Sequence, residues 1–164
     1  MRKRNLIAEL EALYRARYRQ FVRVATAIAG EERAHDVVQE AFARAIRSSS
    51  SFRGEGTVEA WLWQVLINAA RAERSSRADT SSLDDGELPV VGNGHPTDDL
   101  DIRAWVVSLP ERQRLAVFLR YYADLDYRTL ASVLGVEVGT VSATLSAAHS
   151  SLRRSLKEVS RDRR

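Results

Sequence analysis

Apolar residues recur at spacings of three and four along the first half of the chain, the pattern of amphipathic helices. The first such stretch covers residues 6–29 and ends at Gly30, and the second covers residues 33–47. A third follows a serine-rich break, begins after Thr57 and runs to about residue 75. Thr57 carries a hydroxyl that suits an N-cap. Three amphipathic helices with short connections predict one shared core.

The periodicity disappears between residues 79 and 99, where Ser, Asp, Gly and Pro predominate. An unstructured stretch of about twenty residues is uncommon inside one compact domain. We therefore predict an all-α protein of two small helical domains, residues 1–78 and 100–164, joined by an acidic flexible linker at residues 79–99. The second domain is predicted to open with a short helix from about residue 100 to residue 109.

The remaining pattern in the second domain predicts a helix-turn-helix. Pro110 suits the first turn of one helix, and Asp126 can cap a short helix over residues 127–134. Gly135 is placed to make the turn, and a final helix begins at about Val138. A short helix, a glycine-containing turn and a second amphipathic helix are typical of helix-turn-helix motifs.

Charge is distributed unevenly along the chain. The net charge is +5 over residues 1–77, −7 over residues 78–102 and +5 over residues 103–164. Two basic blocks around an acidic stretch favour modules that meet a polyanion. Solvated helix faces with an acidic loop are the alternative that charge alone leaves open.

Composition excludes several classes of protein. The 164 residues include no Cys, so a disulfide-stapled secreted protein is excluded. No apolar run approaches the roughly 20 residues of a membrane span, and the first residues have no signal-peptide core. We expect a cytoplasmic protein without membrane insertion.

No catalytic or metal-binding constellation is present in the sequence. His35, His95 and His149 lie far apart, without the spacing of zinc ligands. Gly54-Glu55-Gly56 does not follow a predicted strand, so no phosphate-binding loop is indicated. We expect no enzyme, no cofactor, no metal and no small-molecule substrate.

Several short segments, in a fixed order, carry a resemblance to a known family. They are Leu13-Tyr14, His35-Asp36-Val37-Val38-Gln39-Glu40-Ala41-Phe42, Phe52-Arg53-Gly54-Glu55, Trp61-Leu62-Trp63, Leu109-Pro110-Glu111-Arg112-Gln113-Arg114, Leu130-Ala131 and Gly139-Thr140-Val141. With the acidic linker between them, the chain resembles a bacterial RNA polymerase sigma factor of the small, two-domain extracytoplasmic-function type. The resemblance implies a factor that binds core RNA polymerase and promoter DNA and melts the −10 region.

The resemblance also assigns roles within the first domain. It assigns docking on the clamp coiled coil of the polymerase to Asp36, Val37, Gln39, Glu40, Phe42 and Arg44. It assigns binding of the separated −10 strand to Phe52, Arg53, Gly54, Glu55, Trp63, Gln64, Asn68, Arg71 and Arg74. Aromatic and arginine side chains suit single strands because they combine stacking with charge. Trp61 lies on the apolar stripe and is expected in the core, whereas Trp63 is expected to contact DNA.

The second domain departs from the family pattern at its recognition helix. From Val136 to Leu152 the only formal charge is Glu137, whereas a helix in the major groove normally uses Arg or Lys. The candidate −35 contacts are Thr140, Ser142, Ala143, Thr144, Ser146, His149, Arg153 and Arg154. Alternatively, the small residues of this helix form a protein-binding surface or a plain exposed face.

Three functions therefore remain open. The favoured one is a promoter-specificity factor, the second is a sigma-like protein whose second domain binds another protein, and the third is a free-standing helix-turn-helix regulator. The last leaves the first domain unexplained. The resemblance further implies an anti-sigma factor that clamps the two domains, and a linker that threads toward the RNA exit path or acts only as a tether.

Overall fold

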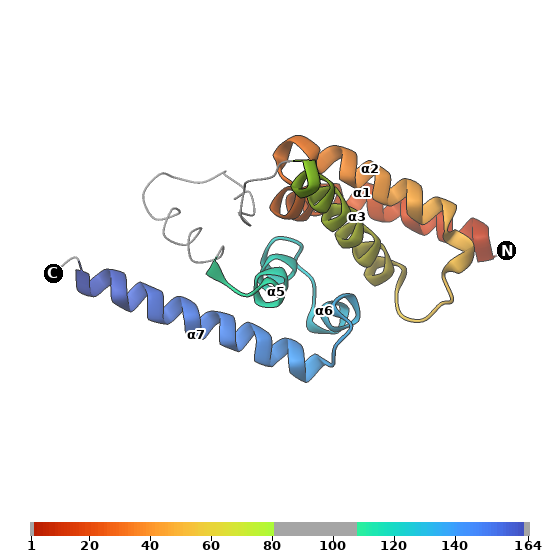
Figure 1. The fold of residues 1–164 in the computed structure, drawn as a ribbon. Helices are drawn as coiled ribbons and strands as arrows, with labels where there is room; N and C mark the ends of the chain where they lie inside the picture. The colour runs from red at the N-terminus through yellow and green to blue at the C-terminus, as the bar shows by residue number, and fades with distance from the viewer. Residues whose placement is uncertain (1, 81–107, 163–164) are drawn as a thin grey trace.

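The computed structural model describes residues 2–80 and 108–162, and every regular element in these two ranges is helical (Figure 1). The predicted all-α fold class is confirmed. Residues 81–99 of the predicted linker, with His95, and residues 100–107 of the predicted short helix lie outside the described residues.

Three helices make up the first half of the fold. They are α1 (Arg2–Ala29), α2 (Glu31–Arg47) and α3 (Val58–Thr80). Gly30 separates α1 from α2 at a φ of 95°, a value that favours glycine. The 3₁₀ helix η1 (Ser49–Ser51) and a loop connect α2 to α3, and the Thr57 hydroxyl accepts the Ala60 N–H at 3.1 Å as the predicted cap.

The ends of these helices differ from the sequence prediction. α1 begins at Arg2 and α2 at Glu31, before the predicted starts at residues 6 and 33. α3 continues to Thr80, two residues into the segment predicted as linker. Ser, Arg, Ala and Asp follow the predicted end of α3 without Gly or Pro, so nothing in this stretch interrupts a helix.

An aromatic cluster holds the three helices together. Phe21 of α1 lies 4.4 Å from the ring of Trp63 and 5.4 Å from the ring of Phe42. Phe21 and Trp63 are fully buried, and Tyr14 meets the edge of Phe42 at 4.9 Å. Each helix contributes at least one ring, so the cluster fixes all three relative to one another.

The second half of the described chain contains the predicted helix-turn-helix. α5 (Glu111–Tyr121) is followed by α6 (Tyr127–Leu134) and α7 (Val138–Asp162). The Asp126 carboxylate accepts the Thr129 N–H at 2.7 Å, and Gly135 ends α6 at a φ of 64°. α6 and α7 meet at a bend of 97°, within the range of helix-turn-helix motifs.

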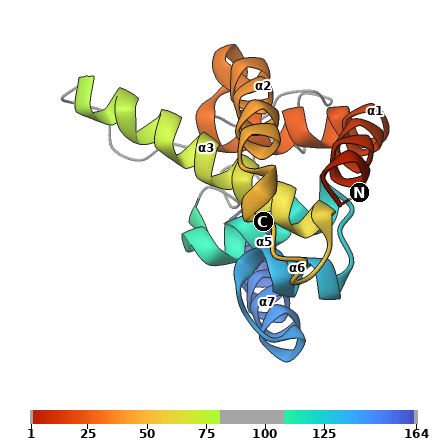
Figure 2. The same ribbon diagram turned by 90° about the vertical axis from the view of Figure 1, so that its right-hand side faces the viewer.

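α3 lies between the two groups of helices. It packs on α1 and α2 on one side and on α6 on the other, and both views show α7 on the far side of α5 and α6 (Figures 1 and 2). The buried apolar side chains of both groups form one continuous cluster. The sequence pattern did not predict this contact between the two groups.

Within the described residues, no single helix combines the length and apolar character of a membrane span, although the bent pair Tyr127–Leu134 and Val138–Ser155 meets that test on length and composition.

The aromatic cluster predicts a graded loss of stability. We expect Trp63→Ala to lower the free energy of unfolding by about 3–5 kcal/mol, because it leaves a cavity among packed rings. Trp63→Phe should cost roughly half as much or less, because it keeps a ring and removes a buried N–H that has no acceptor among the described residues. Urea unfolding followed by circular dichroism measures both. The control is Ile46→Ala at a side chain that is 47% exposed, and equal losses in all three variants would contradict the cluster's role.

Candidate nucleic-acid interface

α2 presents a polar face to solvent. Asp36, Gln39 and Arg44 are exposed, and Glu40 is half-buried. Val37 and Phe42 are only 4% and 7% exposed, because they belong to the apolar face that packs on α1 and α3. The prediction that these two side chains contact a partner is therefore wrong. They pack in the core and so fix the orientation of the polar face on the opposite side of α2.

A carboxylate on α2 organises two arginines. Glu40 Oε1 accepts hydrogen bonds from Arg44 Nε at 2.7 Å and from Arg47 Nη2 at 3.1 Å. The hydrogen bond from Arg44 is the main cause that lowers the pKa of Glu40. At the other end of the helix, Arg33 bridges Asp36 at 3.3 Å and Glu73 of α3 at 2.7 Å.

The loop before α3 projects the predicted −10 residues into solvent. Arg53, Gly54 and Glu55 are exposed, whereas Phe52 is half-buried and its ring lies 5.3 Å from Trp61. Gly54 and Gly56 adopt φ values of 77° and 80°, which side chains disfavour. The two glycines therefore allow the loop to turn sharply beneath its exposed tip.

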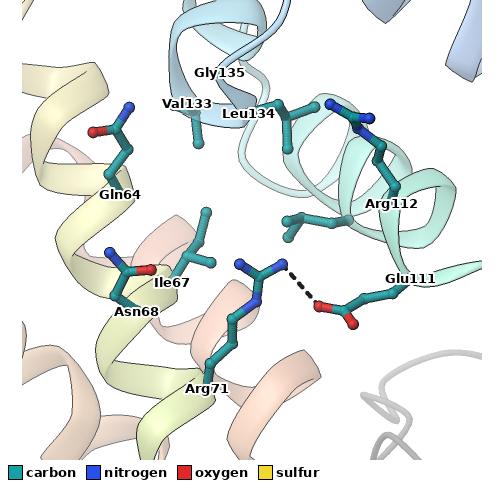
Figure 3. A pocket seen from close by; sticks show the side chains of 10 residues that line it. Gln64, Ile67, Asn68, Arg71, Glu111, Arg112, Val133, Leu134 and Gly135 are labelled. Atoms are coloured by element: carbon teal, nitrogen blue, oxygen red, sulfur yellow. Dashed lines mark hydrogen bonds and ion pairs between the residues drawn. The ribbon is translucent and has the colours of Figure 1, made fainter.

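Three of the predicted −10 residues share one face of α3. Gln64, Asn68 and Arg71 point toward α5 and α6 and line a cavity of about 500 Å³ (Figure 3). Trp63 does not belong to this face, because it is 0% exposed and stacks in the aromatic cluster. The prediction that Trp63 contacts DNA is therefore wrong, and half-buried Trp61 is the tryptophan beside the loop.

Arg74 lies one turn further along α3, where it is half-buried. It lines a small cavity with Arg71, Glu111 and Arg114. Burial lowers the pKa of Arg114, and the neighbouring Arg74 cation lowers it further. Arg74 therefore lies beside α5 and is only partly accessible to solvent.

A shallow hollow that is widely open to solvent lies between α2 and α3. Its lining consists of Arg44, Arg47, Ser48, Val65 and Asn68. It brings together Arg44, predicted for polymerase docking, and Asn68, predicted for DNA. Sequence reasoning missed Arg47, although its position three residues after Arg44 places both on one helix face.

The recognition helix α7 exposes a neutral polar surface. Thr140, Ser142, Ala143 and Ser146 are exposed, and so are Arg153 and Arg154 further along. Thr144 is half-buried and its hydroxyl donates to the Thr140 carbonyl at 2.7 Å.

His149 is half-buried, and its Nε2 is hydrogen-bonded to the Tyr121 hydroxyl at 2.7 Å. To contact a base edge, as predicted, His149 would have to give up its hydrogen bond with Tyr121. His35 is hydrogen-bonded to the Tyr18 hydroxyl at 2.8 Å. No group of three or more metal-ligating side chains exists among the residues that the structure describes.

Two family models match this chain in order. Sigma-70 region 2 matches residues 13–80, which include α2, the loop and α3, and sigma-70 region 4 matches residues 100–158, which include the helix-turn-helix. The chain belongs to the sigma-70 family of RNA polymerase sigma factors, of the extracytoplasmic-function type, and serves transcription initiation.

Individual relatives agree with this assignment. The chain is 27% identical over 148 residues to the RNA polymerase sigma-H factor of Pseudomonas aeruginosa, covering 80% of this chain and 77% of the relative. It is 28% identical over 134 residues to the extracytoplasmic-function sigma-E factor of Escherichia coli, covering 71% and 70%.

Two solved structures share the fold. The sigma factor RpoE of Bartonella quintana, solved with the anti-sigma factor NepR, has a TM-score of 0.60 at 24% identity and covers 94% of this chain and 96% of its own. CnrH, solved with the cytosolic domain of CnrY, has a TM-score of 0.68 at 19% identity and covers 96% and 99%.

The cap of α6 predicts a pH-dependent contribution to stability. The hydrogen bond from the Thr129 N–H lowers the pKa of Asp126. The carboxylate therefore contributes in full above its unfolded-state pKa, and the contribution is lost as the pH falls through the lowered folded-state pKa. We expect Asp126→Ala to cost about 1 kcal/mol at neutral pH.

Asp126→Asn is the matched variant, because its amide oxygen still accepts from Thr129 but does not titrate. It should keep most of the stability at neutral pH and reduce the loss of stability in acid. Thermal unfolding across the acid range measures both effects. An asparagine variant as unstable as the alanine variant at neutral pH would contradict the capping role.

Proposed function

We propose that the exposed face of α2 docks on core RNA polymerase, that the loop and polar face of α3 hold the separated −10 strand, and that α7 meets the −35 element. In this assignment residues 1–78 form the polymerase and −10 domain and residues 100–164 form the −35 domain. The observation that carries the proposal is the gathering of Gln64, Asn68 and Arg71 on one face of α3, next to an exposed loop.

The chemistry of this face suits single-stranded DNA. The Gln64 and Asn68 amides can pair with the exposed edges of unstacked bases, and Arg71 and Arg53 can neutralise phosphates. The Phe52–Trp61 pair beneath the loop offers an aromatic surface on which a base can stack. These groups bind and position a strand, and the melting of the promoter needs no covalent chemistry from them.

Polymerase docking is assigned to α2 because its polar side chains lie together on one face that is open to solvent. Arg33 anchors Asp36, and Glu40 fixes the guanidinium of Arg44. Gln39 lies exposed between these two ion pairs.

The proposed factor acts in the cytoplasm, where core polymerase binds promoter DNA. The two solved neighbours were both captured with a second protein, NepR in one case and the cytosolic domain of CnrY in the other. By analogy, a protein partner of the anti-sigma kind is proposed to regulate this chain.

A second role for the C-terminal helices is supported by their surface. Tyr121, Tyr127 and Val138 are large apolar side chains that are 58%, 38% and 45% exposed, and α7 carries no Lys or Arg before Arg153. Exposed rings and the uncharged first turns of α7 are better suited to protein than to phosphate. The alternative is therefore a sigma-like protein whose second domain binds a protein partner.

Replacing the exposed polar groups of α2 should weaken polymerase binding. We expect Asp36→Ala and Gln39→Ala each to raise the Kd for purified core polymerase roughly fivefold, because each removes one interface contact. Titration of core polymerase against the fluorescently labelled chain measures the Kd. Glu9→Ala, an exposed acidic position on α1, is the control. Unchanged Kd values for both α2 variants would contradict the docking face.

Substitutions on α7 distinguish the two roles of the second domain. If α7 reads DNA, Ser142→Ala with Ser146→Ala should abolish selection of a −35 motif from a promoter library transcribed with core polymerase. Arg153→Ala should lower the salt-dependence slope of promoter binding by about 0.9, the value of one lost phosphate contact.

The control for charge is Arg15→Ala, which changes the net charge equally on a side chain of α1 that is 77% exposed. If the wild-type chain engages core polymerase but selects no −35 motif, and Arg153→Ala leaves the salt slope unchanged, the protein-binding alternative replaces the −35 role.

A further inference from the structure

One flank of α7 carries residues proposed to meet the −35 element, and His149 lies within that flank. Ser142, Ser146, His149 and Arg153 follow one another at spacings of four, three and four residues, so their side chains share one face of the helix. Ser142, Ser146 and Arg153 are exposed, and His149 is half-buried. The flank therefore runs from two hydroxyls, through an imidazole, to the first arginine of α7.

The imidazole of His149 is oriented by α5. Its Nε2 lies 2.7 Å from the Tyr121 hydroxyl, and the centroids of the two rings are 5.9 Å apart. Its Nδ1 has no hydrogen-bond partner among the residues that the structure describes, and it is not a buried atom. One ring nitrogen therefore holds the ring, and the other is open to a ligand.

The contact with Tyr121 is compatible with both charge states of a histidine. A hydroxyl can donate to a bare ring nitrogen or accept from a protonated one. When the Tyr121 hydroxyl donates to Nε2, the hydrogen of the neutral ring lies on Nδ1. Protonation then adds a hydrogen at Nε2 and a positive charge to the ring, while the Nδ1–H stays where it was. The change of charge therefore needs no rearrangement of α7.

No carboxylate pairs with His149 within the described part of the chain. The nearest acidic residues along α7 are Glu137 and Glu158, roughly 13 Å or more away along the helix axis. This exceeds the distance of about 10 Å beyond which salt screens exposed charges at moderate ionic strength. On the same flank, the next charged side chain is the Arg153 cation, one turn later.

The helices that pack on α7 do not supply a carboxylate either. Besides Tyr121, the charged and titratable side chains of α5 and α6 are Glu111, Arg112, Arg114, Arg120, Tyr122, Tyr127 and Arg128. The carboxylate of Glu111 is paired with Arg71 at 2.8 Å. In the loop between the two helices, Asp124 is paired with Arg120 and Asp126 caps α6. A positive charge on His149 would therefore be left for an external anion.

The exposed polar surface of α7 lacks the cations with which a helix in the major groove normally holds phosphates, until Arg153 is reached. Histidine is the side chain that gains a positive charge as the pH falls from about 8 to about 5. We propose that His149 is a pH-dependent phosphate contact. In its protonated form it holds a backbone phosphate of the −35 element together with Arg153, through Nδ1, and keeps its hydrogen bond to Tyr121. This inference rests on the proposed −35 role of α7.

The direction of the effect follows from proton linkage. DNA is a polyanion, so it binds the protonated form of His149 more tightly, and the affinity for the promoter rises as the pH falls. One added phosphate contact steepens the salt dependence of binding by about 0.9 in slope. Hydrogen bonds between charged groups are the stronger ones in proteins. We therefore expect His149 to make binding roughly fivefold tighter at about pH 6 than at about pH 8.

Two substitutions represent the two charge states. His149→Gln is neutral at every pH and keeps a donor and an acceptor, whereas His149→Arg is always positive. The Kd and the salt slope are measured for the complex of each chain with core polymerase, on a promoter fragment that the wild-type chain selects from a library. We expect the wild-type chain to match the arginine variant at about pH 6 and the glutamine variant at about pH 8. Comparing variants at the same pH removes any effect of pH on the polymerase.

His35 provides the matched control. Its Nδ1 lies 2.8 Å from the Tyr18 hydroxyl, so it forms the same kind of pair in the first half of the fold. His35→Gln should retain the pH response of the wild-type chain, because His35 lies on α2 and not on the flank of α7. Circular dichroism of each variant verifies that the helices are intact at both pH values.

The outcomes separate this inference from the −35 role itself. A glutamine variant that keeps the full pH response, a wild-type chain that matches it at both pH values, or an arginine variant that binds no more tightly than the glutamine variant would overturn the role of His149. A wild-type chain that selects no −35 motif, and whose salt slope does not change in Arg153→Ala, would instead overturn the −35 role of α7 and the inference with it.

Discussion

The structure depends on the packing of α3 on two sides. Its apolar side buries Trp63 against Phe21, while its polar side carries Gln64, Asn68 and Arg71. A helix turns 100° per residue, so the neighbouring side chains of Trp63 and Gln64 point in different directions, one into the three-helix core and the other toward α6. The fully buried rings fix the rotation of α3, and that rotation decides which polar groups face away from the three-helix core.

The two sides of α3 differ in the kind of interaction that holds them. Aromatic packing in the core is lost only on unfolding, since its value comes from apolar surface removed from water. The contact with α6 combines a few apolar side chains with hydrogen bonds that water, salt or another polar ligand can replace. The contacts on the two sides of α3 therefore differ in how readily another polar group can replace them.

The charge pattern of α7 has a related consequence. Because its first four turns expose hydroxyls and small side chains, the helix can approach a base edge or a protein closely but cannot gain much from phosphates. The cations lie later, at Arg153 and Arg154. In the proposed −35 role, long-range attraction to DNA and close contact with the bases fall on different parts of one helix, so binding strength and sequence choice would be separable properties.

The sequence predicted α5, α6, α7 and the turn between the last two, because three- and four-residue spacing, the Asp126 cap and Gly135 are local signals. It did not predict the rotation of α3. Apolar residues cover a wide arc there, including Trp61, Trp63 and Val65, so periodicity alone could not decide which tryptophan was buried.

The contact between Gln64 and Ser132 joins residues 68 positions apart through a backbone carbonyl, which every residue possesses. Such a contact leaves no trace in the residue types. Polar residues on a helix face indicate that the face will contact water or another polar group. The same glutamine amide can form hydrogen bonds with a base or with the backbone of its own chain, and only the three-dimensional arrangement shows that Gln64 binds the Ser132 carbonyl here.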